Sequence, residues 1–290
     1  MGQTRLLRWT GLTNLVRIGV LKIGCLGIGL VAEYIIDERA KREDIEVFVV
    51  GTGSKMSIGQ CLNAATELEK QRLDIVLIIS PNPGGEGPRP AIERIGKSGV
   101  PTIILTNAAS RKVTKEFESE GFGYLILEAD AMIGAKREFL DANEAALFNG
   151  DVLKVLAITG AINVVVDALD KVIESVKRTE SPELPRIYVD LESAMTMSGL
   201  RNEYAKSKAM AAHEIARRVA TFSYEGCFVE KDWTKYVPIV ASCHEMMRAA
   251  SKLADEAREI EKCADTVFRQ PHAKDGTRLK KSQLMEKPTD

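Results

Sequence analysis

The sequence predicts an α/β protein with a Rossmann-like parallel-sheet domain, a helical-bundle domain and a small C-terminal β-hairpin. In the first half, short apolar runs alternate with helix-length segments, as in repeated βαβ units. From residue 131 to 177 there is no proline, and apolar residues recur at helical spacing. Near the end, Asp275-Gly276 lies between two short extended runs, which is a hairpin signal. The predicted units are an N-terminal extension (1–15), an α/β domain (16–129), a helical domain (130–265) and a C-terminal β segment (266–290).

Five strands are expected, at residues 16–23, 45–50, 75–79, 102–106 and 123–127. Residues 75–79 form a nearly continuous β-branched apolar run, typical of a strand buried on both faces of a parallel sheet. Helices are expected between the strands, at 30–41, 58–71, 90–97 and 112–120. Right-handed crossovers would then place helices on both faces of the sheet. In the second half, 202–219 and 242–263 have helical periodicity, and prolines interrupt the chain near 183–188.

Composition narrows the class of protein. The chain has 290 residues, of which 45% are hydrophobic and 28% charged, and its formal net charge is -1. These values are ordinary for a globular protein and favour neither a nucleic-acid nor a membrane partner. The five cysteines include no C-x-x-C pair, so reduced thiols in a cytoplasmic protein are expected. The apolar stretch near the N-terminus is too short to span a bilayer.

Four of the predicted strands end in small, polar or glycine-rich connections. Gly24-Cys25-Leu26-Gly27 follows the first strand, 51–57 the second, the Pro/Gly-rich 80–88 the third and 107–110 the fourth. Because open α/β sheets bind ligands at the carboxyl ends of their strands, these loops predict a wide, shallow cleft. Such a cleft fits a large flat ligand or two stacked ligands.

The loops argue against a standard dinucleotide. The first is not G-x-G-x-x-G, and the second strand ends in Gly51-Thr52-Gly53-Ser54-Lys55 without a ribose-binding carboxylate. Glycine amides, hydroxyls and a cation suit a phosphate or carboxylate instead. A plain glycine turn capped by Ser54 or Ser57 is the alternative for this loop.

No catalytic acid, nucleophile or metal ligand is predicted. His213, His244 and His272 all lie on or beyond the helical half. The segment beginning His244-Glu245 lacks the second histidine of a zincin helix, because that position holds Arg248. Direct hydride transfer between two bound organic molecules requires positioning and none of these groups.

Several long segments resemble the coenzyme F420-dependent methylenetetrahydromethanopterin dehydrogenases of methanogenic and related archaea. The resemblance is carried by residues 37–56, 80–88, 123–141, 155–160 and 225–262. It implies reversible hydride transfer between reduced coenzyme F420 and methenyl-tetrahydromethanopterin in archaeal one-carbon metabolism. It also implies a cytoplasmic homo-hexamer built as a trimer of dimers, without metal or flavin. Residues 1–14 have no counterpart in the family pattern, which is consistent with a mis-called start codon.

The resemblance and the strand ends together give a set of expected binding residues. For the cofactor and pterin these are Lys22, Cys25, Leu26, Gly27, Gly51, Thr52, Gly53, Ser54, Lys55, Met56, Pro81, Asn82, Pro83, Asn107, Ala108, Lys136 and Glu138. Lys55 and Lys136 are expected to attract the anionic tails.

One departure from the family keeps alternatives open. Family members tend to read G-N-L-G where this chain has Gly24-Cys25-Leu26-Gly27. The replacement of an amide by a thiol leaves room for a non-catalytic pterin- or deazaflavin-binding paralogue. An NADP-dependent oxidoreductase is a further alternative, through Lys55.

Overall fold

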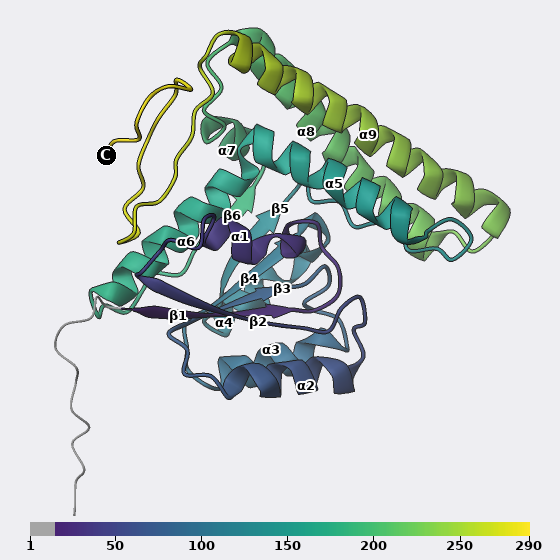
Figure 1. The fold of residues 1–290 in the computed structure, drawn as a ribbon. Coiled ribbons are helices and arrows are strands. Elements are labelled where there is room, and N and C mark those ends of the chain that lie inside the picture. Colours follow the sequence, from purple (N-terminus) through teal and green to yellow (C-terminus); the bar gives the residue numbers. More distant parts are fainter. Residues whose placement is uncertain (1–14) are drawn as a thin grey trace, which may run out of the picture.

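A computed structural model describes residues 15–290, so the predicted N-terminal extension lies, except for Leu15, outside the described residues. The described chain folds around a six-stranded sheet whose neighbouring strands are all parallel, in the order β2-β1-β3-β4-β5-β6 (Figure 1). The strands are β1 (Val16–Lys22), β2 (Ile45–Gly51), β3 (Ile75–Ile79), β4 (Thr102–Asn107), β5 (Gly123–Leu127) and β6 (Arg186–Val189). The five predicted strands are confirmed to within one residue at each end.

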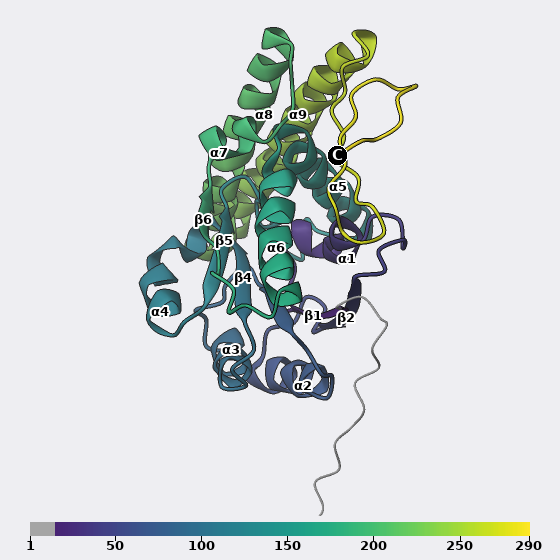
Figure 2. The same ribbon diagram turned by 90° about the vertical axis from the view of Figure 1, so that its left-hand side faces the viewer.

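Helices cover both faces of the sheet, as the alternation of strands and helices predicts. On one face lie α2 (Ile58–Glu69), α3 (Pro88–Gly96) and α4 (Thr114–Ser119), which enclose one apolar cluster with the sheet. On the other face lie α1 (Ala32–Ile36) and α6 (Ala161–Lys177) (Figure 2). A larger apolar cluster continues from that face into the helical part. All five residues of β3 are buried, because this strand lies inside the sheet between two helical layers.

Strand β6 was not predicted from the sequence. This strand pairs with β5 from Tyr124↔Arg186 to Leu127↔Val189. Its four residues follow a proline and directly precede the N-cap Asp190. The segment is therefore too short to show the alternating pattern that indicates a strand. The strand returns the chain to the sheet from within the predicted helical domain, and the domain boundaries themselves stay a prediction.

The first predicted helix, 30–41, is wrong in its second half. A short 3₁₀ turn, η1 (Ile28–Leu30), precedes α1, which ends at Ile36. Beyond it the chain turns, with Ala40 at φ 50, and places Glu38 and Arg42 against the C-terminal segment. Contacts with a distant part of the chain override local helix propensity here.

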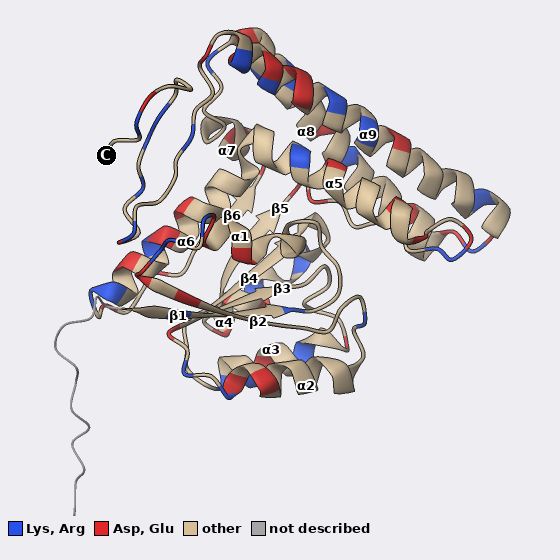
Figure 3. Cartoon of the chain, in the orientation of Figure 1, with Lys and Arg blue, Asp and Glu red and all other residues tan. Residues whose placement is uncertain are grey.

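The helical part is built from α5 (Ala142–Thr159), α7 (Leu191–Thr196), α8 (Glu203–Tyr224), the π-helical turn η3 (Glu225–Val229) and α9 (Trp233–Cys263). Figure 1 shows α5, α8 and α9 packed side by side beyond the sheet. Acidic and basic residues are interspersed along α6 and α9 (Figure 3), as expected for a nearly neutral chain. Among the described residues, no single helix is long and apolar enough to cross a membrane; α5 and α6 pass that test only jointly, across a 70° bend.

The predicted C-terminal hairpin is not confirmed. Residues 266–290 contain isolated antiparallel bridges, Arg269↔Lys281, His272↔Arg278 and Lys280↔Thr289, but no strand. Gly276 does occupy a tight turn, at φ 90, where its added Cβ would collide with Asp44 and Lys177. Side-chain contacts with α6 and the α1–β2 loop therefore determine the path of the segment more than strand pairing does.

Candidate active site

The carboxyl ends of β1, β2 and β3 bring together the largest group of predicted site residues. The Lys22 carbonyl accepts a hydrogen bond from Thr52 N at 2.9 Å, and Gly24 N donates to Thr52 Oγ1 at 3.1 Å. Ile23 N donates to the Ile79 carbonyl at 2.8 Å, which ties β1 to the exit of β3. Hydrogen bonds therefore link the ends of β1, β2 and β3 at the points where the three loops begin.

Gly24 is at the point where these loops converge. Its φ is 76, and a Cβ at this position would lie 2.7 Å from Met56 Sδ and 3.4 Å from Pro81 Cδ. A positive φ and this close approach both require glycine. Gly24, which directly precedes the predicted site residue Cys25, is thus a neighbour of two other predicted residues, Met56 and Pro81, from two other loops.

The turn after β2 is open to a ligand. Gly51, Gly53, Ser54 and Lys55 are exposed, and an added Cβ at Gly53 would meet no atom within 4 Å. Within residues 15–290, Lys55 takes part in no ion pair, whereas Lys22 is paired with Glu33 at 3.1 Å. Accessible glycine amides beside a cation can bind an anionic group of a cofactor or substrate.

Two of the predicted loop residues are buried. Leu26 is only 3% exposed and belongs to the apolar core. The Gly27 amide donates a buried hydrogen bond to Asp130 Oδ1, at 3.1 Å. Cys25 is half-buried, and burial, with a smaller contribution from Asp130, raises the pKa of its thiol.

The predicted residues after β3 and β4 lie at the same edge of the sheet. Pro81 and Pro83 are buried and Asn82 is exposed. Asn107 is 4% exposed and caps the turn η2 (Ala108–Val113) by accepting from Ala109 N at 3.2 Å. Ala108, the first residue of that turn, is half-buried.

Lys136 and Glu138 lie on the segment that joins β5 to α5, and they contact the helical part. Tyr236 Oη donates to Glu138 Oε2 at 2.9 Å, and Lys136 Nζ lies 4.3 Å from the centre of the Tyr236 ring. The segment is fixed further by Ser223 Oγ, which donates to the Met132 carbonyl at 2.6 Å. In the described residues, no hydrogen bond or ion pair joins Lys136 or Glu138 to the loops after β1, β2 and β3.

Two acidic residues that follow β5 were not predicted from the sequence as part of the site. Asp130 is fully buried and accepts from the amides of Gly27 and Ile28, and burial raises the pKa of its carboxyl group to about 7. Glu128 lies 3.6 Å from Arg217, and burial raises the pKa of its carboxyl group as well. Both carboxylates follow a predicted strand directly, which is the signal that could have indicated them.

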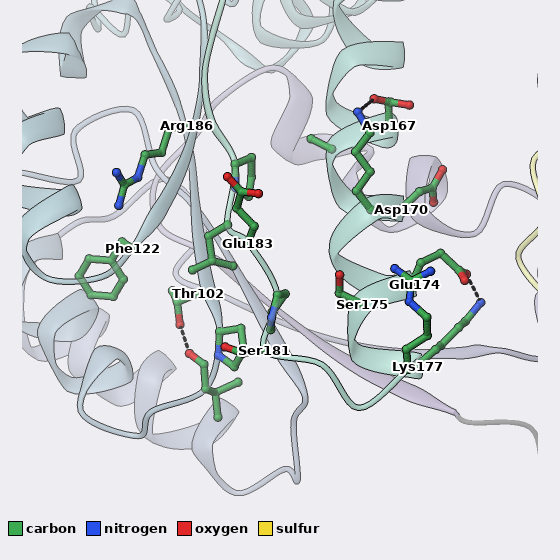
Figure 4. A pocket seen from close by; sticks show the side chains of 18 of the residues that line it. Thr102, Phe122, Asp167, Asp170, Glu174, Ser175, Lys177, Ser181, Glu183 and Arg186 are labelled. Carbon is green, nitrogen blue, oxygen red and sulfur yellow. Dashed lines mark hydrogen bonds and ion pairs between the residues drawn. The ribbon is translucent and has the colours of Figure 1, made fainter.

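A cavity of about 1540 Å³ lies elsewhere, at the amino ends of β4, β5 and β6. Figure 4 shows residues that line it, with Asp170 and Glu174 of α6 on one side and Glu183 and Arg186 on the other. None of the predicted site residues lines it. The cavity is therefore separate from the carboxyl-edge site.

No group of three or more His, Cys, Asp or Glu side chains in residues 15–290 is arranged to hold a metal ion. His272 instead bonds to two carboxylates, and His244 bonds to Glu144 and packs against Phe139 and Phe148. The metal-free site stays a prediction.

A parallel sheet with glycine-rich strand ends, joined to a set of packed helices, defines this chain as an α/β protein of the Rossmann-like type, in which the carboxyl edge of the sheet is the expected place for a ligand. A family model described as methylene-5,6,7,8-tetrahydromethanopterin dehydrogenase matches residues 16–289. The chain belongs to that family and is an oxidoreductase.

Individual relatives are similar over nearly their whole length. The F420-dependent methylenetetrahydromethanopterin dehydrogenase of Archaeoglobus fulgidus is 53% identical, over 94% of this chain and 99% of the relative. The enzyme of the same name from Methanothermobacter thermautotrophicus is 48% identical over the same shares. A solved structure of an F420 dependent methylene-tetrahydromethanopterin dehydrogenase, in complex with methylene-tetrahydromethanopterin and coenzyme F420, matches with a TM-score of 0.91 at 45% identity. It covers 94% of this chain and 99% of that one.

Proposed function

We propose that the chain catalyses reversible hydride transfer between methylene-tetrahydromethanopterin and coenzyme F420 in archaeal one-carbon metabolism. When bound, the two organic molecules supply the chemistry: the methylene carbon gives up a hydride and the oxidised deazaflavin accepts it. The observation that carries the proposal is the likeness, over 94% of the chain, to a structure that holds both molecules. The non-catalytic and NADP-dependent alternatives have no comparable support.

The residues at the carboxyl edge fit ligands of this kind. The exposed backbone of Gly51 and Gly53 leaves room for a polar group to approach, and Lys55 lies in the same turn without an ion-pair partner among the described residues. The chain's contribution is to bind and align two flat molecules, which is the main requirement of a direct hydride transfer. We assign to Lys55 the attraction of an anionic tail, which needs no proton transfer.

Lys136 and Glu138 would complete the site from the side of the helical part. Glu138 accepts from Tyr236 Oη and thereby holds the β5–α5 segment on α9, while Lys136 packs over the same ring. The cation remains half-exposed in this position and can face an anionic ligand group.

We further propose that the protein is a cytoplasmic homo-hexamer, built as a trimer of dimers, as the family resemblance implies.

The decisive assay mixes the protein with oxidised coenzyme F420 and methylene-tetrahydromethanopterin and follows the deazaflavin absorbance. Bleaching, with stoichiometric formation of the methenyl pterin, is expected. A rise in melting temperature with each ligand but no bleaching would identify the non-catalytic paralogue. Turnover with NADP in place of coenzyme F420 would contradict the proposal. Light scattering at micromolar concentration tests the hexamer, and a monomer would refute it.

A further inference from the structure

The glycine loop after β1 and the segment that leads to the helical part meet at one buried carboxylate. Asp130 Oδ1 accepts from Gly27 N and Oδ2 from Ile28 N, each at 3.1 Å. These residues belong to β1 and β5 connections, although two strands, β3 and β4, separate β1 from β5 in the sheet. Asp130 thus bridges the carboxyl edge between non-neighbouring strands.

The contact leaves no spare room. A Cβ at Gly27 would lie 2.6 Å from Asp130 Oδ1 and 2.8 Å from Val152 Cγ1 on α5. The loop is therefore seated between the carboxylate and the helical part. Six residues after Asp130, the same segment carries Lys136, which packs on α9.

The carboxylate has no counter-ion. Within residues 15–290, Asp130 forms no ion pair. The titratable group close to it on the glycine loop is the Cys25 thiol, and Val152 of α5 lies against Gly27 of the same loop. A buried carboxylate without a cation is costly, and two backbone amides offset only part of that cost. Burial raises the pKa of Asp130 to about 7, with the amides of Ile28 and Gly27 opposing the shift.

We infer that Asp130 is a positioning residue for hydride transfer, whose carboxylate fixes the Gly24–Gly27 loop relative to the segment bearing Lys136. The inference rests on the proposed function. Through this contact, the predicted binding residues Cys25, Leu26 and Gly27 are held in a fixed position relative to the predicted binding residues Lys136 and Glu138. A misplacement of about 1 Å is enough to slow a transfer that depends on alignment.

The ionised form is the stronger tie. A charged acceptor forms hydrogen bonds roughly twice as strong as a neutral one. The wild-type protein is therefore expected to gain kcat/KM as the pH rises from 6 to 8, when Asp130 loses its proton. Asp130→Asn keeps the shape but turns an NH₂ group toward one of the two amides.

The matched control is Glu261→Gln. Glu261 is also buried, and its Oε1 accepts from two successive backbone amides, Arg201 and Asn202, each at 2.7 Å. It lies on α9, away from the predicted site, and the pKa of its carboxyl group is lowered, so it remains ionised at both pH values. Both variants damage the same kind of contact, but only one damages the glycine loop.

The experiment compares kcat/KM for both substrates at pH 6 and pH 8 in wild type, Asp130→Asn and Glu261→Gln. Asp130→Asn is expected to lose about tenfold at pH 8 and clearly less at pH 6, the loss of one buried hydrogen-bond partner being of that order. Glu261→Gln is expected to show no such pH-dependent loss at temperatures below its melting point. Equal kcat/KM in Asp130→Asn and wild type at pH 8, or the same pattern in both variants, would overturn the inference.

A readout without substrates separates this inference from the proposed function. Because the charge of Asp130 contributes to the raised pKa of Cys25, Asp130→Asn should speed alkylation of Cys25 at pH 8, with Cys25→Ser identifying the signal. Unchanged alkylation would mean that the carboxylate does not act on the loop in solution. If Asp130→Asn speeds alkylation as expected but the wild type turns over neither substrate, the proposed function fails while the contact between Asp130 and the loop stands.

A second measurement uses only the wild-type protein, so it tests the inference even if Asp130→Asn fails to fold. Hydrogen exchange of the Gly27 and Ile28 amides in the wild-type protein, corrected for the intrinsic rate, should slow as the pH rises through about 7. Protection that is independent of pH from 6 to 8 would also overturn the inference.

Discussion

Lys55 lies in an exposed turn with glycines before it, and no carboxylate of the described chain is paired with it. An exposed cation of this kind contributes about 0.2–1 kcal/mol to attraction of an anion. Lys55→Ala is therefore expected to raise the KM of the substrate whose anionic tail it faces by about 1.4- to fivefold, with kcat nearly unchanged. Steady-state kinetics with each substrate varied in turn measures both constants.

Lys97→Ala is the control for this prediction. Lys97 is also exposed, but it follows α3, and the described structure gives its side chain no ion pair. The KM effect at Lys55 should shrink at high salt, because screening weakens an exposed charge pair. Unchanged KM values for both substrates in Lys55→Ala would remove Lys55 from the site.

The residues of the candidate site could be predicted from the sequence to the extent that their positions follow from strand ends. Gly24, Met56 and Pro81 lie on three loops that parallel strands must bring to one edge, and they are indeed neighbours. Burial within a loop could not be predicted, because neighbouring residues differ in it: Cys25 is half-exposed and Leu26 is in the core. The position of Asp130 shortly after a predicted strand indicates a place near the edge of the sheet, but its contact with Gly27, 103 residues away, could not be predicted from the local pattern.

At the scale of elements, the break between α5 and α6 turns the chain from the bundle onto the sheet. Gly160 lies at this break with φ 92, and an added Cβ would lie 2.3 Å from the Ala194 carbonyl oxygen. Gly160→Ala should thus combine left-handed strain with a clash against backbone. The expected loss in free energy of unfolding is about 2–5 kcal/mol, measured by urea denaturation.

Gly150 provides a matched glycine on the same helix. It lies inside α5, and an added Cβ would meet no atom within 4 Å. Gly150→Ala should therefore stabilise the protein by up to about 1 kcal/mol through helix propensity. A Gly160→Ala variant as stable as Gly150→Ala would show that the break does not need glycine.

Regular elements were predictable in proportion to the length of their pattern. The five longer strands have apolar runs bounded by Gly, Pro or polar residues, and all five are present. β6 has four residues and only one fully buried member, Val189, so its place in the sheet depends on pairing with β5. α1 is shorter than predicted, since Glu38 and Arg42 are recruited by the C-terminal segment and by Asp44.

For the molecule as a whole, His272 holds the C-terminal segment against α6 and the residues that follow α1. In Figure 1 this segment runs beside α6 toward α1. The His272 ring is 2% exposed and lies between two carboxylates, with Nδ1 3.0 Å from Glu38 Oε2 and Nε2 3.0 Å from Asp170 Oδ2. Because ionised carboxylates only accept hydrogen bonds, both ring nitrogens must carry a proton to satisfy both contacts.

The surroundings favour that charged form. Against burial and the nearby Arg42, the bonds to Asp170 and Glu38 raise the pKa of His272 above its usual 6.5. The remaining charges close by are Arg39, which donates to the His272 carbonyl, and Arg278, 3.7 Å from Asp170. Since the folded-state pKa lies above the unfolded one, this contribution to stability is complete below pH 6.5 and is lost as the pH rises through the folded-state pKa.

His272→Gln should therefore cost about 2–4 kcal/mol of unfolding free energy at pH 6, since it removes charged hydrogen bonds. The cost should shrink as the pH rises above 6.5, because the wild type then loses the same contacts. His244→Gln gives the opposite window: burial lowers the pKa of His244, so its difference from wild type should change only below pH 6.5. Urea denaturation of the three proteins from pH 5 to 9 measures both differences. A His272→Gln difference that stays constant above pH 6.5 would mean that the ring is neutral in the fold, and that the C-terminal segment is held by Lys177 and Arg278 instead.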